Sequence, residues 1–171
     1  MRWTTFRPLA RRVLRPILRF ALDTYVVMGD ESRVKVGERV ALANTILNVS
    51  SGRIAIGSRS IFSPNVMLLT GRHEFANGRR ISVDPQFDDG SWGGGDREVP
   101  SEGYDIVIGQ GVWVSAGAII VGGVSIGDNS IVAAGAVVTR SFPEFSILAG
   151  VPAERIGDTR DRNGASAEGR E

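Results

Sequence analysis

The chain has no cysteine among its 171 residues, which excludes disulfide bonds, thiolate zinc sites and cysteine nucleophiles. It has a single histidine, His73, so one chain cannot build a site that needs two or three imidazole groups. It has a single lysine, Lys35, and its 20 basic and 19 acidic residues leave a net charge of +1, which argues against a nucleic-acid binder held by bulk charge. No run of about 20 apolar residues occurs, so we expect no transmembrane helix.

The remaining composition is that of a soluble globular chain, with 42% hydrophobic and 23% charged residues. The length suits one domain with a continuous core. The last residues, 158–171, contain no apolar residue larger than alanine and are typical of a disordered tail. We therefore divide the chain into a basic N-terminal helical segment (1–30), a central domain (31–157) and a disordered tail (158–171).

The N-terminal segment is basic and amphipathic. Six arginines precede the first acid, Asp23, and four of them share a spacing of four residues with one another (Arg7, Arg11, Arg15 and Arg19). The leucines at 14, 18 and 22 lie on another side of such a helix, which Pro16 kinks. Two interpretations are open: residues 1–22 contact an anionic membrane surface, or their leucine side packs on the central domain. We expect no signal peptide and a cytoplasmic protein. If residues 1–22 contact a membrane, we expect the protein to be peripheral at its inner face.

The strongest pattern is a repeat of six residues. Residues 108–143 divide into the blocks IGQGVW, VSAGAI, IVGGVS, IGDNSI, VAAGAV and VTRSFP, in which the first residue is always Ile or Val and the second is small in five blocks of six. Residues 56–73 divide in the same way, and a weaker run from Val36 slips by two residues before Ile56. A period of six is the hexapeptide period of a parallel β-helix.

The physics of that period predicts an all-β fold. Each block gives one short strand and a turn, three blocks close a triangular coil, and equivalent strands stack about 4.8 Å apart. The first and fifth residues point inward, and the small second residue lets the corner turn. About five coils fit between Val34 and Pro143 at that repeat. The repeat is interrupted by residues 74–105, a long loop excursion of a kind that is usually functional or disordered.

Several local motifs resemble hexapeptide-repeat acyltransferases, in particular the galactoside, maltose and nodulation-sugar O-acetyltransferases. The motifs span most of the chain: Ser63–Val66, Thr70–His73, Val107–Val114, Gly122–Ser130, Ala134–Arg140 with Pro143, and Leu148–Ile156. The resemblance implies a left-handed parallel β-helix, a homotrimer and acetyl-CoA as the donor substrate, with no permanently bound cofactor and no metal. Two departures stand out. Arg72 occupies the place before the histidine where relatives carry glycine, and the front segment is short and basic.

His73 is the candidate catalytic residue. It ends the repeat at the start of the excursion, and a hydroxyl that attacks a thioester needs a base that works near neutral pH. A lone histidine is otherwise more often surface decoration than catalyst, so this assignment depends on the repeat and on the resemblance.

Asn44, Trp113, Ala116 and Ala134 are candidate site residues that the resemblance implies, whereas Trp92, Thr139, Arg140 and Arg155 are candidates because of their chemistry, and most of them have a structural alternative. Trp113, Ala116, Ala134, Thr139, Arg140 and Arg155 are expected to bind acetyl-CoA, and Asn44 and Trp92 the acceptor. Asn44 is equally explained as a turn residue, the alanines by coil packing, and Arg155 as a solvated surface charge. Trp92 lies in the excursion, which is either an acceptor lid or a poorly ordered insertion.

The favoured function is transfer of an acetyl group from acetyl-CoA to a hydroxyl of a sugar or glycoconjugate, with a saccharide or glycolipid as acceptor. N-acylation of an amino sugar, transfer of a larger acyl group and a non-enzymatic structural β-helix are the alternatives. A γ-type carbonic anhydrase needs three histidines at its zinc. An ice-binding surface would repeat an outward ladder of Thr or Asn, and the sequence has none. Serine acetyltransferase carries a large helical front domain, which has no counterpart before Val34. The sequence Gly123–Gly127 spells a serine-nucleophile elbow, but it lies inside the repeat rather than between a strand and a helix.

Overall fold

The computed structural model describes residues 25–73, 75–76, 79–80 and 100–164. The predicted N-terminal helix, Trp92, most of the excursion and the end of the tail lie outside these residues. Among the described residues, no helix is long and apolar enough to cross a membrane.

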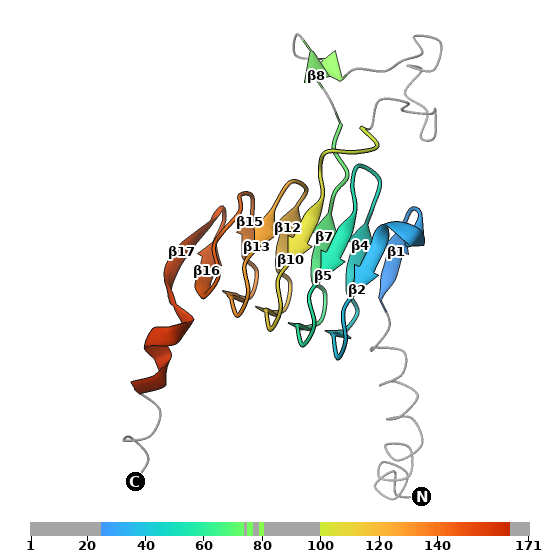
Figure 1. The fold of residues 1–171 in the computed structure, drawn as a ribbon. Helices are drawn as coiled ribbons and strands as arrows, with labels where there is room; N and C mark the ends of the chain where they lie inside the picture. Colours follow the sequence, from blue (N-terminus) through green and yellow to red (C-terminus); the bar gives the residue numbers. More distant parts are fainter. Residues whose placement is uncertain (1–24, 74, 77–78, 81–99, 165–171) are drawn as a thin grey trace, which may run out of the picture.

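The described chain is a parallel β-helix whose coils stack along one axis (Figure 1). Sheet A contains β1 (Val26–Met28), β4 (Ile46–Asn48), β7 (Met67–Leu69), β12 (Ile119–Val121) and β15 (Val137–Val138). Sheet B contains β2 (Val34–Val36), β5 (Ile54–Ile56), β10 (Ile106–Ile108) and β13 (Ser125–Ile126). Sheet C contains β3 (Ala41–Leu42), β6 (Ile61–Phe62), β11 (Trp113–Val114), β14 (Ile131–Val132), β16 (Ser146–Gly150) and the antiparallel β17 (Ala153–Asp158). The chain visits the sheets in the order A, B, C, and the five strands of sheet A correspond to five coils, as the repeat predicted.

Three corners join the sheets, and we name each by the sheets it connects. The AB corner contains residues 29–33, 49–53, 70–73, 100–105, 122–124 and 139–141. The BC corner contains residues 37–40, 57–60, 109–112, 127–130 and 143–145. The CA corner contains residues 43–45, 63–66, 115–118 and 133–136. The excursion therefore leaves the β-helix from the AB corner, at the top of Figure 1.

The interior confirms the predicted inward positions. The first residues of the six blocks from 108 to 143 are at most 2% exposed, and the fifth residues are at most 9% exposed. Those residues are Ile108, Val114, Ile120, Ile126, Val132 and Val138, and Val112, Ala118, Val124, Ser130, Ala136 and Phe142. Stacked coils bury these side chains between them, and this burial is the main driving force for the fold.

The small second residue of each block is required at the BC corner. A Cβ atom built on Gly57 would lie 2.5 Å from the carbonyl carbon of Gly109 in the next coil. Two residues later the backbone enters the left-handed region, with φ of 63° at Arg59 and 54° at Asn129. The corner thus turns through a glycine without a side chain and then a residue in the left-handed conformation.

The predicted slip of two residues before Ile56 has two parts. Strand register aligns Ile46 with Met67, so the corner after Leu42 is one residue shorter than the corner after Phe62. The segment from Leu47 to Ile56 is three residues longer than a regular block, because Val49 and Ser51 fill the AB corner below the excursion. The net shift is the observed two residues.

The ends of the β-helix differ slightly from the predicted boundaries. Strand β1 begins at Val26, ahead of residue 31, because Val26–Met28 pair with Ile46–Asn48. At the other end β17 reaches Asp158, and a 3-10 helix, η3, occupies Thr159–Gly164 within the segment predicted as a tail. Within the excursion, β8 (Phe75–Ala76) and β9 (Arg79–Arg80) form a two-stranded antiparallel ladder that stands away from the coils (Figure 1).

Candidate active site

His73 is an exposed residue at the point where the chain leaves the AB corner. The segment before it, Thr70–Arg72, is held by buried hydroxyl groups. The Thr70 hydroxyl donates to the Asn48 carbonyl at 2.9 Å and accepts the Ser51 N–H at 3.1 Å. The Ser51 hydroxyl in turn accepts the Arg72 N–H at 3.1 Å. Ser51 and Thr70 are both 0% exposed, so this network fixes the backbone that leads directly to His73.

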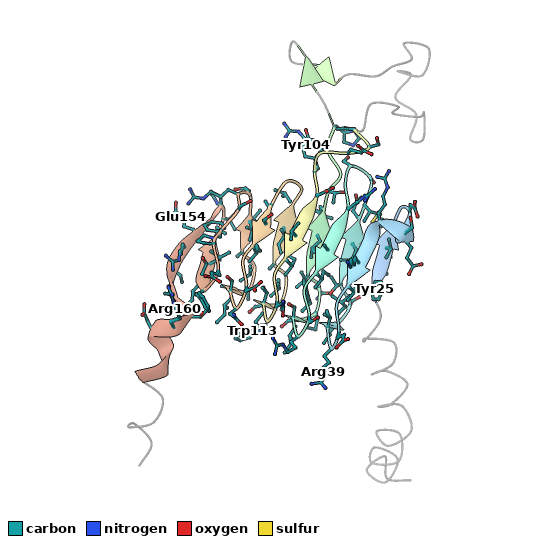
Figure 2. The ribbon with its side chains drawn as sticks, in the orientation of Figure 1. Tyr25, Arg39, Tyr104, Trp113, Glu154 and Arg160 are labelled. Carbon is teal, nitrogen blue, oxygen red and sulfur yellow. The ribbon has the colours of Figure 1, made fainter. Side chains whose placement is uncertain are left out.

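The returning arm of the excursion packs on the same corner. The Tyr104 N–H donates to the Ser51 carbonyl at 3.2 Å, and the Arg72 guanidinium lies over the Tyr104 ring at 5.2 Å. Figure 2 shows Tyr104 at the base of the excursion. A Cβ atom on Gly52 would lie 2.5 Å from the Tyr104 carbonyl carbon, and one on Gly122 would lie 2.7 Å from the Tyr104 Cβ. Two glycines therefore let the returning arm sit directly on the coils.

A polar cavity of about 230 Å³ opens beside the returning arm. Its lining includes Arg33, Arg53, Glu102 and Asp105. Arg33 donates to the Ser101 carbonyl at 2.8 Å, and Asp105 accepts the Arg53 N–H at 2.8 Å, so these two side chains tie the arm to the first two coils. Arg53 and Glu102 also line this cavity, so it contains side chains of both charges.

Asn44 lies at a different corner, the CA corner. Its side-chain amide donates to Asn65 Oδ1 at 2.6 Å, and both residues have positive φ, 46° and 63°. This geometry agrees with the turn interpretation of Asn44 and gives it a structural partner. Its contact with an acceptor stays a prediction.

Ala116 and Ala134 occupy equivalent turns of the CA corner in successive coils. The neighbouring N–H groups at these turns donate to backbone carbonyls, including Gly117 to Pro64 and Gly135 to Ala116. Within the described part of the chain, the N–H groups of Ala116 and Ala134 donate to no protein acceptor, and both residues are exposed. Two backbone donors without a partner among the described residues thus lie on exposed residues one coil apart, which suits a ligand with amide or carbonyl oxygens along the axis.

Trp113 lies on the outer face of sheet C and is 47% exposed. Its indole N–H donates to Ser63 Oγ at 3.4 Å, which orients the ring toward the CA corner. Its ladder neighbour Ile61 is 53% exposed, so the two side chains form an apolar patch on this face. Figure 2 shows Trp113 on the opposite side of the coils from Tyr104.

The remaining candidates lie near the C-terminal end of the β-helix. Thr139 and Arg140 are exposed at the AB corner, and the Arg140 guanidinium lies over the Phe142 ring at 5.2 Å. Arg155, on β17, is bound to Asp158 at 2.6 Å. Asp158 also binds Arg160 at 2.7 Å, and the hydrogen bond from Arg160 holds the pKa of the Asp158 carboxyl well below its usual range. Arg155 is therefore already partly neutralised, whereas Arg140 presents its charge to solvent.

The structure thus gathers the candidates at two corners rather than at one. His73, Thr139 and Arg140 belong to the AB corner, and Asn44, Ala116 and Ala134 to the CA corner. Sheet A separates these corners within one chain.

The sequence does not reveal the residues that hold the backbone beside His73, namely Ser51, Thr70 and Tyr104. Thr70 lies in one of the motifs that resemble relatives, but the two backbone groups that bind its hydroxyl come from another coil. Ser51 lies in the irregular segment where the repeat slips, and that irregularity was the available signal. Among the described residues, no group of three or more His, Asp or Glu side chains is placed to hold a metal ion.

Comparison with known proteins identifies the repeat and the fold. Residues 105–140 match the family model described as bacterial transferase hexapeptide (six repeats). Galactoside O-acetyltransferase of Escherichia coli is 30% identical over 137 residues, which cover 77% of this chain and 57% of that enzyme. A galactoside acetyltransferase structure in complex with coenzyme A superposes with a TM-score of 0.59 at 29% identity, covering 80% of this chain and 60% of that one.

A hexapeptide-repeat acetyltransferase of Vibrio cholerae, solved with acetyl coenzyme A, shares the fold with a TM-score of 0.56. It is 21% identical and covers 86% of this chain and 77% of that one. The coil of three parallel sheets, the repeat and these likenesses agree with one another, and they support the left-handed form of the β-helix. Residues 105–140 therefore carry the hexapeptide repeat of bacterial transferases, and the described chain resembles hexapeptide-repeat acetyltransferases in sequence and fold.

Proposed function

We propose that the protein transfers an acetyl group from acetyl-CoA to a hydroxyl of a sugar or glycoconjugate. The observation that carries this proposal is the placement of His73 on a backbone fixed by Ser51 and Thr70, at the mouth of the excursion. Support also comes from the galactoside O-acetyltransferase relative and from the neighbour solved with coenzyme A. Because the chain spans only 57% of that relative's length, the whole activity is proposed rather than carried over.

In this proposal His73 is the general base. The imidazole takes the proton of an acceptor hydroxyl as the oxygen attacks the thioester carbonyl carbon, which gives a tetrahedral intermediate. Collapse of the intermediate breaks the C–S bond, and the imidazolium returns its proton to the leaving CoA thiolate. The products are the acetyl ester and CoA, and the histidine is regenerated. No cysteine is present, and Ser125 lies inside the repeat, so direct transfer is preferred to an acyl-enzyme.

The CA corner supplies the donor side of the proposed site. The N–H groups of Ala116 and Ala134 suit the amide oxygens of the pantetheine arm, and an amide near Ala116 would stabilise the developing oxyanion. At the AB corner, the exposed Arg140 is a better placed partner for CoA phosphates than Arg155, with Thr139 beside it. Trp113 and Arg155 complete the proposed contacts to acetyl-CoA, and Asn44 and Trp92 are the proposed contacts to the acceptor.

We further propose a homotrimer with the site between subunits. His73 at the AB corner and the donor groups at the CA corner come together only if the AB corner of one chain faces the CA corner of the next. The exposed side chains of Ile61 and Trp113 favour a covered face. A closed cyclic assembly covers such a patch on every chain without leaving an open edge.

The test is release of CoA thiol from acetyl-CoA with a panel of neutral sugars, acidic sugars and glycolipids, with the acetylated product identified by mass. Matched amino sugars test for N-acetylation, because N-acetyl products resist mild base and O-acetyl products do not. We expect ester products that depend on His73. Amide products alone would replace the proposal by N-acylation, and no turnover with any acceptor would overturn it.

A further inference from the structure

The left-handed residue of the CA corner changes in kind along the β-helix. In four successive coils this position is occupied by Asn44, Asn65, Gly117 and Gly135, with φ between 46° and 70°. Within the described part of the chain, a Cβ atom on either glycine would have no atom of a non-neighbouring residue within 4 Å. Asparagine adopts the same conformation in the two earlier coils, so neither packing nor backbone geometry requires glycine in the two later ones.

These glycines border the two backbone donors of the proposed site. Gly117 follows Ala116 and Gly135 follows Ala134, and we call residues 116–117 and 134–135 the donor lane. An asparagine in the lane would add a side chain beside these N–H groups, whereas glycine leaves the space clear for the pantetheine arm. One coil nearer the N-terminus the equivalent residue is Asn65, so the lane ends at an amide side chain.

The side chain of Asn65 is oriented by its neighbour in the previous coil. Its Oδ1 accepts the Asn44 side-chain N–H at 2.6 Å, which leaves Nδ2 as the donor end of the amide. Within the described residues Nδ2 donates to no acceptor, and Asn65 is exposed. An exposed donor that is already oriented binds a carbonyl oxygen at a smaller cost in side-chain entropy than a free side chain does.

Asn65 belongs to the same coil as His73. Asn65 precedes β7 at the CA corner, and His73 follows β7 at the AB corner. A threefold axis parallel to the β-helix keeps every coil at its height, so the proposed trimer brings His73 of one chain level with Asn65 of the next. The phosphate candidates Arg140 and Arg155 lie toward the C-terminal end of the β-helix. A donor substrate that runs from them along the lane therefore has its thioester at the level of Asn65.

We propose that the Asn65 side chain donates a hydrogen bond to the thioester carbonyl oxygen of acetyl-CoA in the transition state. This inference rests on the proposed reaction and adds a side-chain donor to the backbone amide near Ala116. As the acceptor oxygen bonds to the carbonyl carbon, the π electrons of the C=O bond move to the oxygen, and Nδ2–H stabilises the negative charge. Collapse restores the C=O bond and breaks the C–S bond, while His73 passes the hydroxyl proton to the CoA thiolate. Asn65 neither gains nor loses a proton.

Asn65→Gly tests the proposal because it removes the donor and keeps the turn. Glycine accepts the φ of 63° and already occupies the equivalent positions 117 and 135. We expect kcat to fall by about 10²–10³-fold, as for the loss of one oxyanion-hole donor. The KM and the dissociation constant of acetyl-CoA should change little, because the bond is made mainly in the transition state.

Two further variants separate the donor from the turn. Asn129→Gly is the matched control, because Asn129 also has a positive φ, 54°, but lies at the BC corner, and we expect its kcat to stay at the wild-type value. Asn65→Asp keeps an oxygen that accepts the Asn44 amide and removes the donor, so kcat should fall at least as far as in Asn65→Gly. Urea unfolding of each variant shows that the β-helix is intact.

Four other results would overturn the inference. An active wild type with an unchanged kcat in Asn65→Gly removes Asn65 from the mechanism and leaves the proposed reaction standing. A higher KM for acetyl-CoA at unchanged kcat shows that Asn65 only binds the donor. Equal losses of kcat in Asn65→Gly and Asn129→Gly, with lower stability in urea, show that both residues act through the fold. A wild type without turnover on any acceptor overturns the proposed reaction and this inference together.

Discussion

At the residue scale, the proposed chemistry depends on His73. Replacement of His73 by Asn keeps a polar side chain of similar size and removes the base. We expect kcat to fall by about 10²–10⁴-fold, with little change in KM for acetyl-CoA, because the general base acts in the transition state. Thiol release measures the rate, and circular dichroism checks the fold. A variant that keeps more than about a third of the wild-type kcat, far outside that range, would remove His73 from the mechanism.

Ser51 is expected to position His73 without touching substrate. Ser51→Ala leaves the Arg72 N–H without its acceptor and loosens the backbone next to the base. Ser60→Ala is a matched control, because Ser60 is also 0% exposed and accepts the Val112 N–H at 3.1 Å, but at the BC corner. Both changes should cost about 1–3 kcal/mol of unfolding free energy. Only Ser51→Ala should lower kcat, and an equal loss of kcat in both would show that the effect is stability alone.

At the scale of the elements, two positions of the BC corner should differ in their tolerance of an exchange between glycine and a residue with a side chain. Gly57→Ala places a Cβ against the Gly109 backbone and should lower the unfolding free energy by about 1–3 kcal/mol. Arg59 has a φ of 63°, so Arg59→Gly removes a backbone cost of about 1–2 kcal/mol that offsets the added flexibility of glycine. Urea unfolding should therefore show a loss for Gly57→Ala and none for Arg59→Gly. The reverse order would contradict this account of the corner.

The strands and their inward residues were predictable because the six-residue period is a direct consequence of the coil. The first and fifth positions from Ile108 onward needed no knowledge of distant contacts. The excursion root was less predictable, because Ser51 and Thr70 meet only after two coils have stacked. The left-handed conformation of Arg59 could not be predicted from the sequence either, because nothing in an arginine side chain requires a positive φ.

At the scale of the whole molecule, motifs in the sequence indicate candidate residues for one site but not where those residues lie in space. Motifs along the chain indicate His73 and Ala116 as site residues. The corner at which each residue lies depends on which sheet contains the strand before it. Strand pairing across coils places them on either side of sheet A. The separation in one chain is thus a structural finding, and it makes the assembly part of the proposed mechanism.

The assembly can be tested by complementation. His73→Asn damages the AB corner, and Ala116→Trp should fill the CA corner where the donor is proposed to bind; each variant alone should be inactive. If each site combines the AB corner of one chain with the CA corner of the next, random mixing of equal amounts leaves about a quarter of the sites with both halves intact. Co-expression with two affinity tags, followed by light scattering and thiol release, should then show a trimer with about a quarter of wild-type activity. A site contained in one chain would carry a lesion in every copy, so mixed assemblies without activity, or a stable monomer, would contradict the shared site.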